Sequence, residues 1–129
     1  MKHIASRENP HFKALKKLCQ SGRERRKSGL ALLDGMHLIE SYVKHFGRPE
    51  EVVVSEGAVS RHEIAGYLDS VHTGKTVSVL TDTLFNDLAL VDTPSGIMAV
   101  VLQPRCLHGL NQEADAILLD AIQDPGNLG

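Results

Sequence analysis

The hydrophobic positions of this sequence fall into short apolar runs separated by stretches with helical spacing. Four runs predict buried strands, at residues 30–34, 51–55, 76–80 and 97–102. These runs lack a strict polar alternation, which is typical of strands that are covered on both faces. Because strands that alternate with helices favour parallel pairing, the pattern predicts an α/β layer fold with a largely parallel sheet.

A helix is predicted before the first of these strands. Asn9 is a candidate cap, Pro10 suits the first helical position, and Gly22 is a candidate end. Apolar residues at helical spacing form one face of this helix, and they are Phe12, Leu15, Leu18 and Cys19. The lysines between them are therefore expected to point to solvent.

Three further helices are predicted between the strands. One covers residues 35–46, where apolar side chains recur at helical spacing. The next follows a possible capping box made by Ser60 and Glu63. A short helix through Leu88 has Thr81 or Thr83 as its candidate cap.

The charge of the chain is distributed very unevenly. Residues 1–28 contain nine Lys or Arg and two Glu, a balance of +7, whereas the other 101 residues contain five Lys or Arg and fourteen acidic residues, a balance of −9. A basic arm on an acidic body indicates binding of a polyanion. The alternative is an ordinary solvated helix face.

Several classes of function have no support in the sequence. No stretch approaches the roughly 20 apolar residues that span a bilayer, and the N-terminus has no signal-peptide core, so a cytoplasmic protein with no membrane partner is expected. Cys19 and Cys106 lack metal or redox spacing and are interpreted as reduced thiols. The histidines are scattered, so no metal site is expected, and no dinucleotide or ATP fingerprint is present.

Two short loops carry candidate binding residues. Gly35 and His37 lie where a predicted strand passes into a helix, a position where free backbone N–H groups bind anions and a glycine permits close approach. The alternative is a simple turn followed by a surface histidine. Asn127 lies between two glycines, where its amide can orient a neighbouring group or contact ribose and phosphate; on residue type alone it is a turn residue.

Four segments together resemble a known family. They are "IASRENPHFKALKKL" (4–18), "LLDGMHLIES" (32–41), "TPSGIMAVV" (93–101) and "ILLDAIQDPGNLG" (117–129). In this order and at similar spacing they resemble the signatures of the SpoU family of RNA ribose methyltransferases. The last segment is the most specific of the four.

The resemblance implies a two-part organisation. Residues 1–102 look like a small layered α/β/α substrate-binding domain, similar to the ribosomal proteins that bind kink-turn RNA. Residues 103–115 are then a linker. Residues 116–129 look like the first strand and first motif of a knotted α/β methyltransferase domain, which in the family binds S-adenosylmethionine and forms the homodimer.

The implied function is the RNA-binding part of an S-adenosylmethionine-dependent 2′-O-ribose methyltransferase acting on ribosomal or transfer RNA. Asn127 matches the asparagine that lies at the family's active site. The sequence contains neither the arginine that follows in that motif nor the later donor-binding motifs. Methyl transfer needs donor and hydroxyl held in line, so this chain by itself is expected to be catalytically inactive.

The residues expected to contact structured RNA are Arg7, Lys13, Lys16, Lys17, Arg23, Arg25, Arg26, Lys27, Gly35 and His37. Aromatic residues are few, with two Tyr, three Phe and no Trp, which favours recognition of backbone and shape over base stacking. The alternative function is a stand-alone RNA-binding module related to kink-turn-binding ribosomal proteins. A reading frame that continues past Gly129 distinguishes the enzyme from this alternative.

Overall fold

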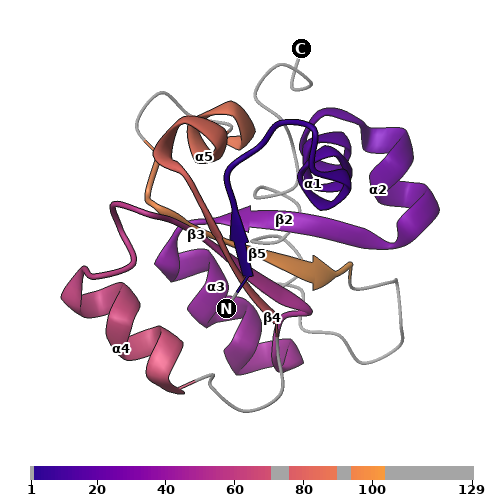
Figure 1. Ribbon diagram of the computed structural model, residues 1–129. Coiled ribbons are helices and arrows are strands. Elements are labelled where there is room, and N and C mark those ends of the chain that lie inside the picture. The colour runs from indigo at the N-terminus through magenta and orange to yellow at the C-terminus, as the bar shows by residue number, and fades with distance from the viewer. Residues whose placement is uncertain (1, 71–75, 90–93, 104–129) are drawn as a thin grey trace.

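A computed structural model describes residues 2–70, 76–89 and 94–103 of the chain (Figure 1). Its elements in chain order are β1 (Lys2–Ile4), α1 (Pro10–Gln20), α2 (Gly22–Ser28), β2 (Leu30–Asp34), α3 (Met36–Phe46), β3 (Glu51–Ser55), α4 (His62–Ser70), β4 (Thr76–Leu80), α5 (Asp82–Leu88) and β5 (Ile97–Leu102). The predicted linker, except Gln103, and the predicted catalytic-domain segment with Asn127 lie outside the described residues.

The strands form one five-stranded sheet in the order β1-β4-β3-β5-β2. β4 pairs in parallel with β1 and with β3, whereas β5 pairs antiparallel with β3 and with β2. The sheet is therefore mixed, and the expectation of a largely parallel sheet was wrong for half of its pairings. An apolar run carries no information on strand direction, and the short strand β1 was not predicted because only Ile4 in it is buried.

Helices cover both faces of the sheet, with α3 and α4 on one side and α1, α2 and α5 on the other (Figure 1). Alternate residues of β5 serve the two layers: Ile97, Ala99 and Val101 pack with α3 and α4, and Met98 and Val100 pack with α1 and α5. Both sets are buried, which explains why the run shows no polar alternation. The predicted α/β/α layering is confirmed. None of the described helices has the length and apolar character needed to cross a bilayer.

The local signals at helix ends were accurate at some positions and wrong at others. Asn9 caps α1, with its Oδ1 accepting from the His11 amide at 2.8 Å, and Pro10 is the first helical residue. Gly22 does not end this helix. It begins α2, which Ser21 caps by accepting from the Glu24 amide at 3.1 Å. The basic run at 23–27 is therefore a helix of its own.

The cap of α5 is Thr81 rather than Thr83, since the Thr81 hydroxyl accepts from the Leu84 amide at 3.4 Å. Helix α4 begins at His62, one residue later than a capping box at Ser60 requires. Arg61 takes the position before the helix, where its carbonyl accepts from the Ala65 amide at 2.8 Å. This shift places the Arg61 side chain at the edge of the sheet where β3 ends.

One buried carboxylate lies beneath α1. Glu51, at the start of β3, accepts from the Ser78 hydroxyl at 2.5 Å and from His11 Nε2 at 2.7 Å. Ser78 is fully buried on β4 and His11 lies in the first turn of α1. Because a buried charge is stable only when it is paired and hydrogen-bonded, this contact ties the start of α1 to two strands.

Gly96, immediately before β5, occupies a position that permits no side chain. Its φ is +92°, and a Cβ placed on it would lie 2.5 Å from Ala58 Cβ. Its carbonyl accepts from the Ser55 amide at 2.9 Å, so the backbone has no room to withdraw without losing this bond. The close approach joins the start of β5 to the end of β3.

Replacing Gly96 by Ala is expected to lower the free energy of unfolding by about 2 kcal/mol or more, through backbone strain and overpacking. Urea denaturation measures the change. Gly66→Ala is the matched control, because Gly66 lies within α4 with open space around it, and this variant should be stabilised by up to about 1 kcal/mol. Equal stability of the two variants would contradict the packing described at Gly96.

Candidate nucleic-acid interface

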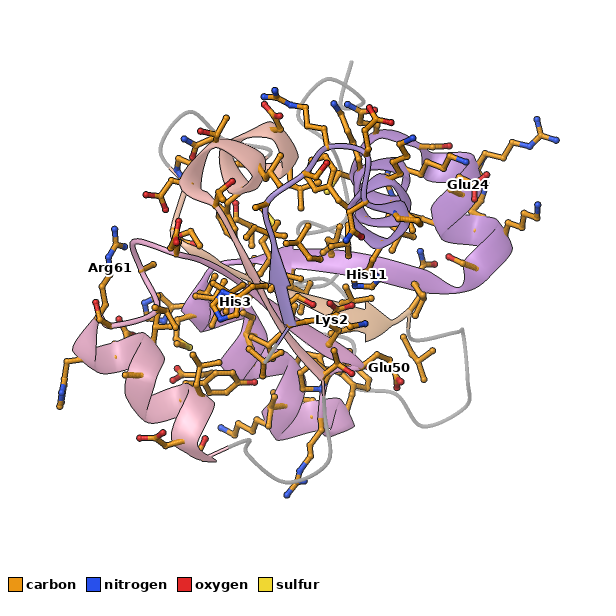
Figure 2. The ribbon with its side chains drawn as sticks, in the orientation of Figure 1. Lys2, His3, His11, Glu24, Glu50 and Arg61 are labelled. Atoms are coloured by element: carbon orange, nitrogen blue, oxygen red, sulfur yellow. The ribbon has the colours of Figure 1, made fainter. Side chains whose placement is uncertain are left out.

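The structure separates the predicted RNA-contacting residues into two places. The lysines and arginines of α1 and α2 lie on one side of the molecule, and Gly35 and His37 lie with Arg61 at the edge of the sheet where β2 and β3 end. Figure 2 shows the two places on opposite sides of the view, with Glu24 of α2 at one and Arg61 at the other. They are therefore two separate candidate surfaces.

The first is called the α1–α2 basic surface, and its members are Lys13, Lys16, Lys17, Arg23, Arg26 and Lys27. All are exposed except Lys16, which is half-buried. Spacings of three and four residues place Arg23, Arg26 and Lys27 on one face of α2. Lys13 pairs with Glu8 at 3.1 Å, and the other five form no ion pair among the described residues. The surface thus presents positive charge that nearby acids do not neutralise.

Arg25 does not belong to this surface, contrary to the sequence prediction. It is 7% exposed, and its Nη1 donates to the carbonyls of Leu18 and Cys19 at 2.7 and 3.0 Å. These carbonyls lie in the last turn of α1, where intrahelical donors run out. Arg25 therefore joins α2 to the end of α1. The sequence alone does not distinguish it from the other basic residues of α2.

Arg7 also has a partner within the fold. Its guanidinium pairs with Asp87 of α5 at 2.8 Å, although its side chain remains 59% exposed. The pair connects the segment after β1 to α5.

Cys19, whose carbonyl accepts from Arg25, has a free thiol as predicted, and burial raises the pKa of this thiol to about 12. A buried thiol with so high a pKa stays protonated at neutral pH.

The second place is a cavity of about 340 Å³, called the edge pocket. Gly35, His37, Arg61, Glu63 and Ser95 line it, together with apolar side chains that include Met36, Ile64 and Ile97. The φ of Gly35 is +108°, a conformation that favours glycine. Its amide donates to the Ile97 carbonyl at 3.1 Å, so the start of α3 is joined to the start of β5.

Asp34 and Ser95, which both line the edge pocket, are hydrogen-bonded to each other. The Ser95 hydroxyl donates to Asp34 Oδ1 at 2.6 Å, across 61 positions of sequence. Burial raises the pKa of Asp34, and the bonds from Ser95 oppose that rise. Its Oδ2 is buried and has no hydrogen-bond partner among the described residues. Asp34 therefore holds the segment before β5 through its bond from Ser95.

A second cavity of about 260 Å³ adjoins the first and is called the neighbouring pocket. Its lining includes Gly57, Asp82, Asn86 and Gly96, and it shares Arg61 with the edge pocket. Asp82 accepts from the Gly57 amide at 2.9 Å, and Arg61 Nη1 donates to the Ser95 carbonyl at 3.1 Å. Sequence reasoning missed Arg61, although it is one of only five Lys or Arg outside the basic arm and follows a predicted strand.

Comparison with known proteins gives a family and a curated relative. Residues 9–99 match the family described as the MRM3-like substrate binding domain. The whole chain is similar, at 33% identity over 129 residues, to the 23S rRNA (guanosine(2553)-2′-O)-methyltransferase RlmP of Bacillus subtilis (strain 168). The chain spans about half of that relative, 48% of its length.

Solved structures share the fold. An RNA 2′-O ribose methyltransferase superposes with a TM-score of 0.69 at 22% identity, over 85% of this chain and 41% of the other. The SpoU methyltransferase AviRb from Streptomyces viridochromogenes, in complex with AdoMet, has a TM-score of 0.58 at 19% identity, over 78% and 35%. Together the family, the relative and the shared fold confirm the resemblance to SpoU methyltransferases that the four sequence segments indicated.

The two arginines at adjacent positions of α2 should differ in their effect on stability. Arg25→Ala removes a buried charged donor from two carbonyls and is expected to lower the free energy of unfolding by roughly 1.5–3 kcal/mol. Arg26→Ala, at an exposed site, should change it by less than about 0.5 kcal/mol. Urea denaturation of both variants tests this, and a loss of stability in Arg26→Ala as large as in Arg25→Ala would refute the assignment.

Proposed function

This chain belongs to the family of MRM3-like substrate-binding domains, and we propose that it binds structured RNA through the α1–α2 basic surface. The observation that carries the proposal is the set of five cations on α1 and α2 that have no acidic partner among the described residues. When Lys and Arg side chains neutralise RNA phosphates, counterions condensed on the RNA are released, and this release favours binding. Gly35 and His37 belong to the other surface, and their contact with RNA stays a prediction.

Two features favour phosphate recognition on this surface. The cations stand on two anchored helices, since Arg25 joins α2 to α1 and His11 joins α1 to the sheet. The two helices that carry the cations are therefore in place before an RNA arrives, which reduces the entropic cost of binding. The described cations also lie on a body whose remaining residues are strongly acidic, so that RNA is directed toward α1 and α2 and away from other faces.

For the whole protein, we propose an S-adenosylmethionine-dependent RNA 2′-O-ribose methyltransferase. The supports are the name of the relative, which acts on 23S rRNA, and the AdoMet bound to a structural neighbour. Ribosomal RNA is then the favoured substrate. The homodimer and the active-site role of Asn127 remain predictions from the resemblance, and the cytoplasmic location remains a prediction from the N-terminal sequence. S-adenosylmethionine supplies the methyl group. We assign it to neither cavity described above, because the resemblance places donor binding in later motifs that this sequence does not contain.

Removing the α2 cations should weaken RNA binding and its dependence on salt. In the variant Arg23→Ala, Arg26→Ala, Lys27→Ala, the slope of log affinity against log salt should fall by roughly 0.7–0.9 for each phosphate that the chain no longer neutralises. Arg25 is left intact because its removal would disturb the fold. Fluorescence titration of a ribosomal RNA hairpin at several salt concentrations measures the slope.

Lys44→Ala is the control for this titration, because Lys44 is exposed at the end of α3, on the opposite face of the sheet. This variant should keep the slope of the unmodified chain. An unchanged slope in the triple variant would show that the α1–α2 basic surface is only a solvated face.

The 129-residue chain by itself is expected to bind ribosomal RNA without methylating it, since the resemblance assigns donor binding to motifs that this sequence does not contain. Incorporation of a radioactive methyl group from S-adenosylmethionine into unmodified 23S rRNA measures the activity, with the Bacillus subtilis relative as positive control. Incorporation by the chain alone above background would disprove this expectation.

A further inference from the structure

We propose that the α1–α2 basic surface binds the double-helical stem of an RNA, with its cations on the phosphates and Gln20 as the residue that recognises a ribose 2′-hydroxyl. The inference rests on the proposed RNA-binding function and names the class of RNA that this surface takes. It also adds Gln20 to the residues that the sequence predicted to contact RNA.

The cations of the surface are arranged as one row on each helix. Lys13 and Lys17 are four residues apart on α1, and Arg23 and Lys27 have the same spacing on α2. Side chains so spaced lie on one face of a helix with Cβ atoms about 5–6 Å apart, similar to the step between successive phosphates of a nucleic-acid strand. Glu24 is the only acidic residue of the two helices, and it is half-buried. Each row therefore suits the phosphates of one strand.

The two rows are fixed relative to each other. Ser21 is both the C-cap of α1 and the N-cap of α2, so no linker separates the two helices. Arg25, which is buried on the inner side of α2, donates to the carbonyls of Leu18 and Cys19 at 2.7 and 3.0 Å. The strands of an RNA duplex hold their phosphates at a constant separation, and duplex RNA is recognised by this shape. A fixed pair of rows therefore matches a duplex better than a flexible single strand.

No free aromatic ring lies on α1 or α2, the two described helices that carry the surface. Phe12 is 1% exposed, and the half-buried His11 ring is hydrogen-bonded to Glu51 at 2.7 Å. No other residue of these two helices has a ring of this kind. Proteins that bind single strands stack the bases on aromatic side chains. The bases of a duplex are already stacked on one another, so contacts to phosphate and ribose are sufficient for binding.

Gln20 lies where the two rows meet. It is the last residue of α1, three residues after Lys17 and three before Arg23, and its side chain is exposed. Its amide forms no hydrogen bond within the described part of the chain, and it offers donors as well as an acceptor. A ribose 2′-hydroxyl also donates and accepts, and it is displayed in the wide minor groove between the two strands. Gln20 therefore has the position and the chemistry to bond to it.

Three RNAs of equal length test the proposal: a duplex, the same duplex with 2′-fluoro groups in place of the hydroxyls, and a single strand that cannot fold on itself. The 2′-fluoro duplex keeps the A form, but its 2′ position cannot donate a hydrogen bond. Fluorescence titration of the complete chain gives the affinity for each RNA. The unmodified chain should bind the single strand about tenfold more weakly than the duplex, and the 2′-fluoro duplex about threefold to tenfold more weakly.

Two substitutions separate recognition of the hydroxyl from neutralisation of phosphate. Gln20→Met removes the amide with little change in volume, and it should abolish the difference between the two duplexes while leaving the salt slope unchanged. Lys17→Met, on the same face of α1, should lower the salt slope by roughly 0.7–0.9 and keep that difference. Each variant is therefore the matched control for the other. Met favours helix, and thermal unfolding of both variants checks the fold.

Three results would overturn the proposal: a single strand bound as tightly as the duplex, equal affinity of the unmodified chain for the two duplexes, or retention of the difference between them in Gln20→Met. Loss of that difference in Lys17→Met as well would also overturn it, because a general loosening of the complex would then explain both variants. Failure of the proposed function is distinguishable, because it would appear as absent RNA binding or as an unchanged salt slope after removal of the α2 cations.

Discussion

The antiparallel insertion of β5 between β3 and β2 is the constraint on which the rest of this structure depends. β5 forms ladders with both neighbours, and its side chains enter the cores on both faces of the sheet. The insertion brings Ser95 and Gly96, which precede β5, beside Asp34 at the end of β2 and Ser55 at the end of β3. A β-strand fixes the positions of the residues at its ends, so the pocket walls follow from strand pairing.

The two candidate surfaces follow from different physical requirements. A phosphate-binding surface needs exposed cations on a rigid support, and α1 and α2 provide it without any cavity, because Arg25 and His11 hold the two helices. A pocket needs enclosure, and here the end of β2, the start of β5 and the first turns of α3 and α4 supply it together. The two surfaces are separate, as Figure 2 shows, with Glu24 of α2 on one side of the view and Arg61 on the other.

Much of the fold was predictable because its signals are local. The four long strands agree with the apolar runs, and Asn9, Pro10 and Thr81 cap or begin helices through contacts within a few residues. Such contacts depend on neighbours in sequence, so a pattern in the chain is sufficient to predict them. The exposure of Lys13 and Lys17 on α1 was predicted for a similar reason, since charged residues of an amphipathic helix lie away from its apolar face. Helix α2 was not predicted.

The sequence by itself therefore determined the four long strands, the helices α1, α3, α4 and α5, the basic arm and the resemblance to SpoU methyltransferases. Tertiary structure alone decided the direction of β5, the burial of Arg25 among equally basic neighbours, and the place of Arg61 between two pockets. Each depends on partners that no local pattern specifies, such as Ser95 for Asp34 and for Arg61. Contacts between distant residues form only when the sheet assembles, and a side chain's role is then set by what surrounds it.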